Sequence, residues 1–395
     1  MNILYKFGNS VKIFILKYLI FKPLQQTLLL AFFFIICGCI KQFIPEVSED
    51  QDILVVEGLI TDQPGQNEIK VSTSMPLGIS SSANPVTGCT ATITDNLGNI
   101  YNLQERDSGT YVADPSFQGV IGRSYTLHLK ASSSYHNQTY ESSAVLMNPV
   151  PPIDSLYYER LVLKRGDDGF PTGEGCQIYI STHDPGNMCK YYRWEFAETW
   201  EIRLPYIVPN KVCWVTNKEG KINIKNMSSY SENIINHLPI NYVSNETDRL
   251  KVRYSILVNQ YSMNEDEFTY WDKLQSIVQQ VGSLYDKIPA STPGNIRCIE
   301  KPSETVLGYF SASAVSSRRI FVNGYFRGMP DLYSDCENAS VSYFDSIPGL
   351  NHGVWVIIDE PQPYPGFRIL TFTKGCADCT VRGTNIQPDY WYEGK

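Results

Sequence analysis

The sequence predicts a mostly β protein with two domains, an N-terminal antiparallel sandwich and a larger β-rich domain that carries one inserted helix. Three observations predict this class. Short runs of alternating apolar and polar residues recur along the chain, which is typical of half-buried strands. Turn-forming glycine and proline are frequent, at 27 and 23 residues, and tyrosine, which favours strands, reaches 26. A single segment has helical periodicity instead.

The chain begins with a segment that predicts export. Residues 28–36 are wholly apolar, lysines but no acidic residues precede them, and the segment ends in Ile36-Cys37-Gly38-Cys39. This order is typical of a secretory signal, and with cysteine at the first mature position it resembles a bacterial lipobox. The resemblance implies a signal peptide over residues 1–38 and a lipid on Cys39. The alternative, an uncleaved membrane anchor, is disfavoured because Pro23 interrupts the apolar pattern and leaves about 13 residues to Ile36, where roughly 20 are needed to span a bilayer.

The charge of the mature chain excludes some partners. Removing residues 1–38 takes away four lysines and leaves 29 basic residues (33 minus 4) against 41 acidic ones. Nucleic acids need a basic surface, so we expect no nucleic-acid partner. Membrane attachment must then come from the lipid on Cys39 and not from charge. Residues 39–52 hold four acidic residues and Pro45 without a strand pattern, which indicates a flexible tether.

Residues 53–147 have the pattern of the first domain. About seven short strands with turn signals every ten residues or so indicate a sandwich, for example the run 53–60 before the turn 62–65 and the hairpin 90–103. Residues 122–127, Gly-Arg-Ser-Tyr-Thr-Leu, resemble the penultimate strand of immunoglobulin-like and fibronectin-like modules. The sandwich is therefore expected to be immunoglobulin-like. The antibody-type Cys-Trp-Cys spacing is absent, so the resemblance does not imply a disulfide across its core.

A proline-rich segment, 148–152, separates this sandwich from a β-rich C-terminal domain over residues 148–395. Ser262 and Glu265 have capping-box spacing, and an apolar stripe at helical spacing follows them. These features predict a helix over about residues 263–281 that packs on the sheet of this domain. The stripe, which includes Phe268, Trp271 and Leu274, is expected to be core.

Eight cysteines follow the lipidation site, and an even number in an exported protein favours disulfides. They are Cys89, Cys176, Cys189, Cys213, Cys298, Cys336, Cys376 and Cys379. Their number allows 105 pairings, so the pairing stays open. The Cys376-x-x-Cys379 motif could also be a redox or zinc site. A redox site would need a helix N-terminus at the motif, and a zinc site would need a second pair of ligands. The motif lacks both, so structural disulfides are favoured, either between these two cysteines or from each to another cysteine.

No pattern of catalytic residues occurs in the sequence. The five histidines are scattered, and nucleophile-elbow, zinc-protease and phosphate-loop motifs are absent. We therefore expect no catalytic residue, no bound metal and no cofactor, and a protein that is not an enzyme. The C-terminal aromatic residues Tyr390, Trp391 and Tyr392 could contact a partner, since aromatic side chains contribute strongly to interfaces.

Six segments in order resemble the DUF4249 family of Bacteroidetes lipoproteins, a domain of unknown function. They include residues 54–62, 151–156, 282–286, 293–296 and 307–313, and the C-terminal stretch from Cys376 to Trp391. The resemblance covers essentially the whole mature chain. It implies an outer-membrane lipoprotein that accompanies a TonB-dependent receptor, and it implies no catalytic residue.

These features together favour a non-enzymatic lipoprotein of the outer membrane that binds a ligand or assists a TonB-dependent receptor in nutrient uptake. The ligand, a small molecule or a glycan, is not specified by any motif. Two alternatives from other classes stay open. One is a cell-surface hydrolase of glycans or peptides, which would need two facing carboxylates or a nucleophile with its base. The other is a purely structural or adhesive surface protein.

Overall fold

The computed structural model describes residues 53–65, 67–74, 84–132, 135, 137–165, 170–205, 208–218, 220–280, 292–329, 338–342, 355–359, 367–371 and 373–391. The chain divides into two units, Met1–Gln51 and Asp52–Lys395, and every described residue belongs to the second. The predicted signal peptide, Cys39 and the tether lie outside the described residues. Within those ranges, no helix combines the length and the apolar character needed to cross a membrane.

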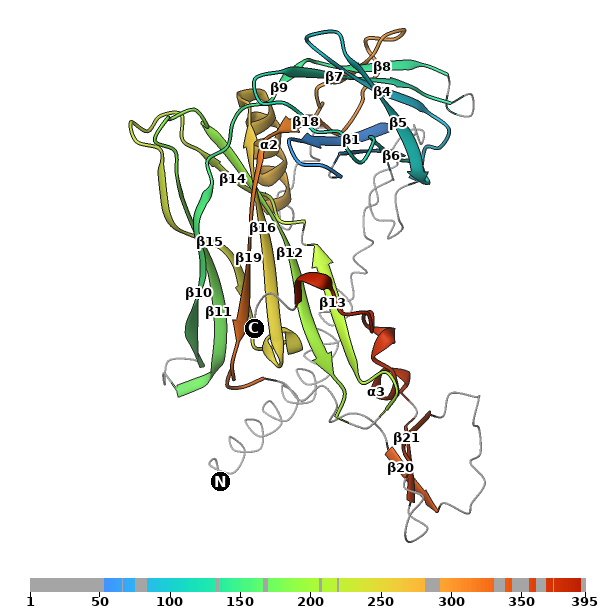
Figure 1. The fold of residues 1–395 in the computed structure, drawn as a ribbon, viewed down its shortest axis with the longest axis vertical. Coiled ribbons are helices and arrows are strands. Elements are labelled where there is room, and N and C mark those ends of the chain that lie inside the picture. Colours follow the sequence, from blue (N-terminus) through green and yellow to red (C-terminus); the bar gives the residue numbers. More distant parts are fainter. Residues whose placement is uncertain are drawn as a thin grey trace, which may run out of the picture. The chain divides into compact units, whose positions relative to one another are not determined.

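The N-terminal strands form a mixed sheet that nearly closes into a barrel (Figure 1). Its continuous order is β17-β8-β7-β4-β5-β6-β2-β1-β18, with β3 beside β2 and β9 beside β7. The strands are β1 (Leu54–Thr61), β2 (Glu68–Thr73), β3 (Asn84–Pro85), β4 (Thr90–Asp95), β5 (Ile100–Asp107), β6 (Thr110–Val112), β7 (Ser124–Lys130), β8 (Thr139–Ser142), β9 (Val145–Leu146), β17 (Ile296–Cys298) and β18 (Phe310–Ser313).

The mostly β prediction is confirmed, but this sheet differs from an antiparallel sandwich made of residues 53–147 alone. Strands β17 and β18 come from the second half of the chain, and β18 runs parallel to β1 with Phe310 opposite Gly58. Glycine is needed at this position, because a Cβ on Gly58 would lie 2.6 Å from Ile69 Cδ1 and 2.9 Å from the Phe310 ring. Parallel strands are joined by a long connection, so a local sequence pattern cannot predict that β1 pairs with β18.

Two further sheets, formed by strands between residues 153 and 323, pack face to face. One has the order β10-β11-β15, from β10 (Ile153–Arg165), β11 (Phe170–His183) and β15 (Ile234–Val243). The other has the order β13-β12-β16-β19, with β14 also beside β12. Its strands are β12 (Tyr191–Arg203), β13 (Val212–Lys218), β14 (Asn223–Asn226), β16 (Arg253–Met263) and β19 (Val315–Asn323). Their inner faces bury apolar side chains such as Ile178, Trp194 and Val258 in one core. A small third sheet, β20-β22-β21, is formed by Asn338–Ser342, Phe367–Thr371 and Trp355–Asp359.

The predicted helix is present as α2 (Glu265–Gln280). Its cap differs from the prediction. Asn264 Oδ1 accepts a hydrogen bond from the Glu267 backbone N–H at 2.7 Å, which makes Asn264 the capping residue. Ser262 is instead still in β16, where its Oγ donates to the Asn148 carbonyl at 2.6 Å. Asn264 has the same three-residue spacing to Glu267 as Ser262 has to Glu265, and the Ser262 hydroxyl is already bonded to Asn148 and to the Ala314 backbone N–H.

Residues 374–391, here called the C-terminal strap, lie beside β13, an edge strand of the five-stranded sheet (Figure 1). The strap contains α3 (Lys374–Ala377) and the short 3-10 turns η2 (Cys379–Val381) and η3 (Asp389–Trp391); a further turn, η1 (Asp248–Leu250), precedes β16. A Cys213–Cys379 disulfide and a backbone bridge between Trp214 and Thr384 attach the strap to β13.

Candidate functional site

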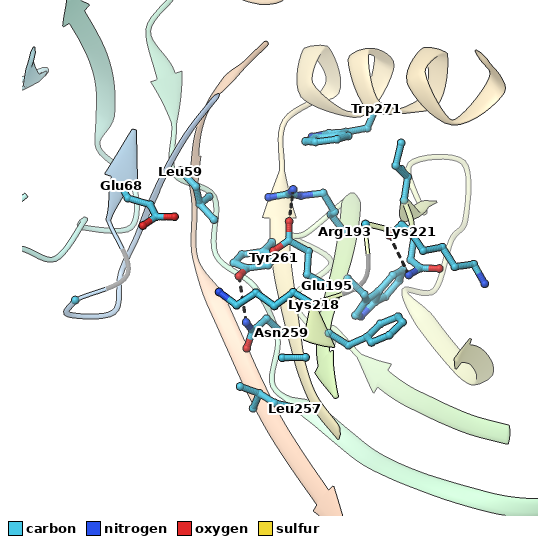
Figure 2. Close-up of a pocket in the computed structure, with 17 residues that line it drawn as sticks. Leu59, Glu68, Arg193, Glu195, Lys218, Lys221, Leu257, Asn259, Tyr261 and Trp271 are labelled. Carbon is cyan, nitrogen blue, oxygen red and sulfur yellow. Dashed lines mark hydrogen bonds and ion pairs between the residues drawn. The ribbon is translucent and has the colours of Figure 1, made fainter. Parts of the chain in front are cut away.

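A groove lies on the outer face of the five-stranded sheet, between helix α2 and the barrel strands β1 and β2 (Figure 2). Its first lobe has a volume of about 530 Å³ and its second about 250 Å³. The lobes are contiguous because both are lined by Leu59, Glu68, Arg193, Glu195 and Trp271. Such a concave site, with a mixed polar and apolar lining, is the usual form of a ligand pocket.

Strand alternation produces the floor of the groove. On β12 the residues Arg193, Glu195 and Ala197 point outward, while the intervening residues enter the core. Their cross-strand neighbours on β16 are Tyr261, Asn259 and Leu257. Both β12 and β16 are interior strands, since β12 pairs with β16 and with β13 and β14, and β16 also pairs with β19. A ligand on this floor is therefore recognised by side chains.

Arg193 is the central charged residue of the groove. Its guanidinium lies 4.8 Å from the Trp271 ring centroid and 5.0 Å from that of Tyr261, so it is held between two aromatic rings. Its Nη1 donates to Glu195 Oε1 at 2.6 Å. The residue is only 6% exposed, and its Nε has no hydrogen-bond partner among the described residues.

Glu267 lies behind the second lobe. The residue is fully buried, and its Oε1 accepts hydrogen bonds from Ser311 Oγ at 2.7 Å and Trp271 Nε1 at 3.4 Å. Its Oε2 has no hydrogen-bond partner within the part of the chain that the structure describes. Burial raises the pKa of this carboxyl, and the positive charge of Arg193 partly opposes the rise. Glu267 therefore links α2 to β18, and the charge of Arg193 in the groove affects its pKa.

Aromatic and acidic side chains share the second lobe. Tyr270 of α2 and Tyr309, just before β18, have ring centroids 4.9 Å apart, and both line this lobe. Glu57 and Lys70 line it from β1 and β2. Burial, and after it the negative charge of Glu57, raises the pKa of Tyr270 to about 12. Burial also raises the pKa of Tyr309, followed by the charges of Glu267 and Asp266.

The first lobe ends at the connection between β13 and β14. Lys218 is the last residue of β13, and Lys221 precedes β14; both are exposed and line the lobe. Figure 2 shows Lys218 beside Glu195, with Leu59 and Glu68 on the facing wall. No histidine lines either lobe, and the described residues contain no group of acidic, histidine and cysteine side chains that could hold a metal ion.

Sequence patterns did not reveal this groove, because its residues come from distant segments. Trp271 was expected in the core, yet it is half-buried and lines both lobes. Of the predicted stripe on α2, Phe268 and Leu274 are also only half-buried, and the one fully buried residue among positions 265–277 is the acidic Glu267. An acidic residue next to an aromatic stripe was the one local signal available.

The cysteines that were predicted to form disulfides are not among the residues that line the groove. Cys213 pairs with Cys379, and Cys376 is also disulfide-bonded, so the two cysteines of the Cys-x-x-Cys motif do not pair with each other. Four others are free thiols in the structure: Cys89, Cys176, Cys189 and Cys298. Burial raises the pKa of both Cys176 and Cys189 to about 12, so these thiols stay protonated. Cys336 lies outside the described residues.

The predicted C-terminal aromatic residues contact their own chain. Trp391 is 3% exposed, and its Nε1 donates to Glu201 Oε2 at 3.3 Å. The Tyr390 ring lies 3.6 Å from the Arg319 guanidinium, and its hydroxyl is 3.0 Å from Thr199 Oγ1. These two side chains hold the strap on the five-stranded sheet. Tyr392 lies outside the described residues.

Comparison with known proteins gives one family. A search among curated proteins found no match to this chain. The sequence profile of DUF4249, a domain of unknown function, matches residues 40–319, which include the barrel, both lobes of the groove and helix α2. The strap lies beyond the matched part. With 280 of 395 residues matched (319 minus 39), the chain belongs to the DUF4249 family.

Proposed function

We propose that this chain is a non-enzymatic, lipid-anchored protein of the outer membrane that captures a ligand in the groove and works beside a TonB-dependent receptor in nutrient uptake. The lipid on Cys39 would hold the protein at the membrane. The barrel-like sheet would be the spacer or docking module that the sequence assigned to an immunoglobulin-like sandwich. The family resemblance supports the receptor partner, and the N-terminal sequence supports the anchor.

The observation that carries the binding part of the proposal is the groove itself. Its floor places Arg193 between two aromatic rings, next to Glu195, in a concave site of about 530 Å³ that side chains of several segments line. Its charged and aromatic lining suits a polar ligand, and the rigid sheet below holds the lining in place.

Ala197→Trp tests the groove, because a large ring at this half-buried floor position fills the first lobe. Asn102→Trp, at an exposed site on β5, is the matched control. The tagged full-length proteins are expressed in the native cells. Two quantities are measured: the uptake of the nutrient that the receptor imports, and the amount of receptor that co-purifies with each tagged protein. We expect both variants to recover a TonB-dependent receptor, and only Ala197→Trp to lose uptake.

Two results would contradict the proposal. One is normal uptake with Ala197→Trp, which would remove the groove from the function. The other is recovery of no outer-membrane receptor from cells that express both proteins. The anchor is tested separately with Cys39→Ala, which we expect to release the protein from the membrane fraction because a thioether-linked lipid can no longer form.

A further inference from the structure

We propose that the groove binds a zwitterionic ligand of the short-peptide class, with its ammonium group in the second lobe and its carboxylate in the first. This inference rests on the proposed function, since it names the class of ligand for the same groove. It is carried by the opposite charges of the two lobes and by the aromatic side chains of the second.

The second lobe has the lining of a cation site. Glu57, Glu68 and Glu195 face it, against Lys70 and Arg193. Lys70 pairs with Glu68 at 3.3 Å and Arg193 with Glu195 at 2.6 Å, while Glu57 has no ion pair among the described residues. Tyr270, Trp271 and Tyr309 supply aromatic rings beside this carboxylate. Acidic and aromatic side chains together are the groups that bind ammonium ions.

The chain already places a cation in this environment. The Arg193 guanidinium lies against Trp271 and Tyr261 and is paired with Glu195. The arrangement shows that the rings and carboxylates at the junction of the lobes stabilise positive charge. The ammonium group of a ligand would meet the same chemistry at Glu57 of β1, on the barrel wall of the second lobe.

The first lobe has the opposite charge. Lys218 and Lys221 line it, with side chains that extend in opposite directions (Figure 2), and neither has an ion pair in the part of the chain that the structure describes. The acidic residues of this lobe, Glu68 and Glu195, are those already paired with Lys70 and Arg193. A carboxylate bound beside Lys218 would therefore meet an ammonium group that makes no ion pair with a described residue.

Unpartnered buried polar atoms lie where the lobes meet. Arg193, which lines both lobes, is 6% exposed with its Nε unpartnered, and the fully buried Glu267 beside Trp271 has an unpartnered Oε2. Such atoms are costly in a protein interior and are kept where function requires them. Of these two residues Arg193 lines the groove and Glu267 lines neither lobe, so only the arginine can take part in recognising a ligand.

The floor decides how a peptide would bind. Peptides that add a strand to a sheet need an unpaired edge, but β12 and β16 are interior strands. Recognition must then depend on the side chains of the groove, which can pair with the charged ends of a short unblocked peptide. A neutral oligosaccharide would gain none of the charge-assisted contacts that a zwitterion can make with Glu57 and Lys218.

The test is calorimetric titration of the detergent-solubilised full-length protein with trialanine in four forms: free, N-acetylated, C-amidated and capped at both ends. Maltotriose is the neutral comparison. We expect free trialanine to bind and each single cap to weaken binding about tenfold, since each removes one charge-assisted contact. Maltotriose is expected not to bind.

Charge variants assign the ends. Glu57→Gln should weaken only the forms with a free amino terminus, and Lys218→Gln combined with Lys221→Gln only the forms with a free carboxyl terminus. Glu232→Gln and Lys301→Gln, exposed and outside the groove, are the matched controls. Equal binding of free and capped trialanine, or no binding of any form at millimolar concentration, would overturn the proposal.

The same titrations separate this proposal from the proposed function. If maltotriose binds, trialanine does not, and Ala197→Trp abolishes the binding, the ligand class is wrong while the groove remains the binding site. If trialanine binds equally to Ala197→Trp and to the unchanged protein, the groove is not the site, and both proposals fail.

Discussion

The side-chain amide of Asn295 is hydrogen-bonded at both of its ends to the backbone of Phe310. Asn295 Nδ2 donates to the Phe310 carbonyl, and Oδ1 accepts from the Phe310 N–H, both at 2.9 Å. Asn295 directly precedes β17, the first strand of the barrel order, and Phe310 begins β18, the last. One side chain therefore joins the two ends of the nearly closed sheet.

Asn295→Ala should destabilise the protein by about 2 to 3 kcal/mol, because two backbone groups of a buried residue lose their partners. Asn102→Ala, at an exposed position on β5, should change the free energy of unfolding by less than about 0.5 kcal/mol. Urea unfolding followed by circular dichroism measures both. An equal midpoint for the two variants would mean that Asn295 does not hold the barrel closed.

The local elements of this fold could be predicted from the sequence. The alternating run at residues 53–60 is the strand β1, and the periodic segment after β16 is helix α2. Both depend on neighbouring residues, whose spacing the sequence displays directly. The N-cap was misplaced by two residues, because Ser262 and Asn264 are both capping residue types and only tertiary contacts decide between them.

The long-range relations could not be predicted. The parallel pairing of Gly58 with Phe310 joins segments about 250 residues apart, and neither segment carries a pattern that names its partner. The groove has the same origin, since Leu59, Arg193 and Trp271 meet only through that pairing and the position of α2. A single sequence gives composition and periodicity, and neither specifies which distant segments meet.

Removal of the Cys213–Cys379 disulfide should loosen the strap. The bond joins residues 166 positions apart, so breaking it releases a long loop in the unfolded chain. Cys213→Ala combined with Cys379→Ala should lower the free energy of unfolding by about 2 to 5 kcal/mol. Limited proteolysis under native conditions should then cut within residues 374–391 first. Unchanged protease resistance of these residues would show that Trp391 and its neighbours hold the strap without the bond.

Glu267→Gln should make the protein more stable above neutral pH. Burial raises the folded-state pKa of this carboxyl above its ordinary 4.5, so the folded protein binds the proton more tightly than the unfolded chain. This contribution to stability is complete below the ordinary pKa and is lost as pH rises through the folded-state pKa. Glutamine does not ionise, so the variant avoids the loss.

The measurement for Glu267→Gln is the difference in unfolding free energy between variant and unchanged protein, at several values between about pH 4 and about pH 8. This difference should increase with pH. Glu232→Gln, at an exposed position, should give a difference that does not change. A difference for Glu267→Gln that stays constant across the range would show that this carboxyl has the same pKa in both states.

Arg249→Ala should be among the most destabilising substitutions in the second half of the chain. Glu198 is fully buried between the two packed sheets, and Arg249 Nη1 donates to both of its oxygens, at 2.9 and 3.1 Å. Tyr254 also donates to Glu198 at 2.6 Å, and burial raises the pKa of this tyrosine well above its ordinary value, so it remains a donor at high pH. Removing the arginine leaves a buried carboxylate without its counter-charge, at a cost of about 3 to 5 kcal/mol.

Glu198→Gln in the Arg249→Ala background should recover part of this loss, because it removes the uncompensated charge while keeping an acceptor for Tyr254. Urea unfolding of the two single variants and the double variant measures the coupling. Strictly additive effects would mean that the two residues contribute independently and that the buried charge is balanced by other groups.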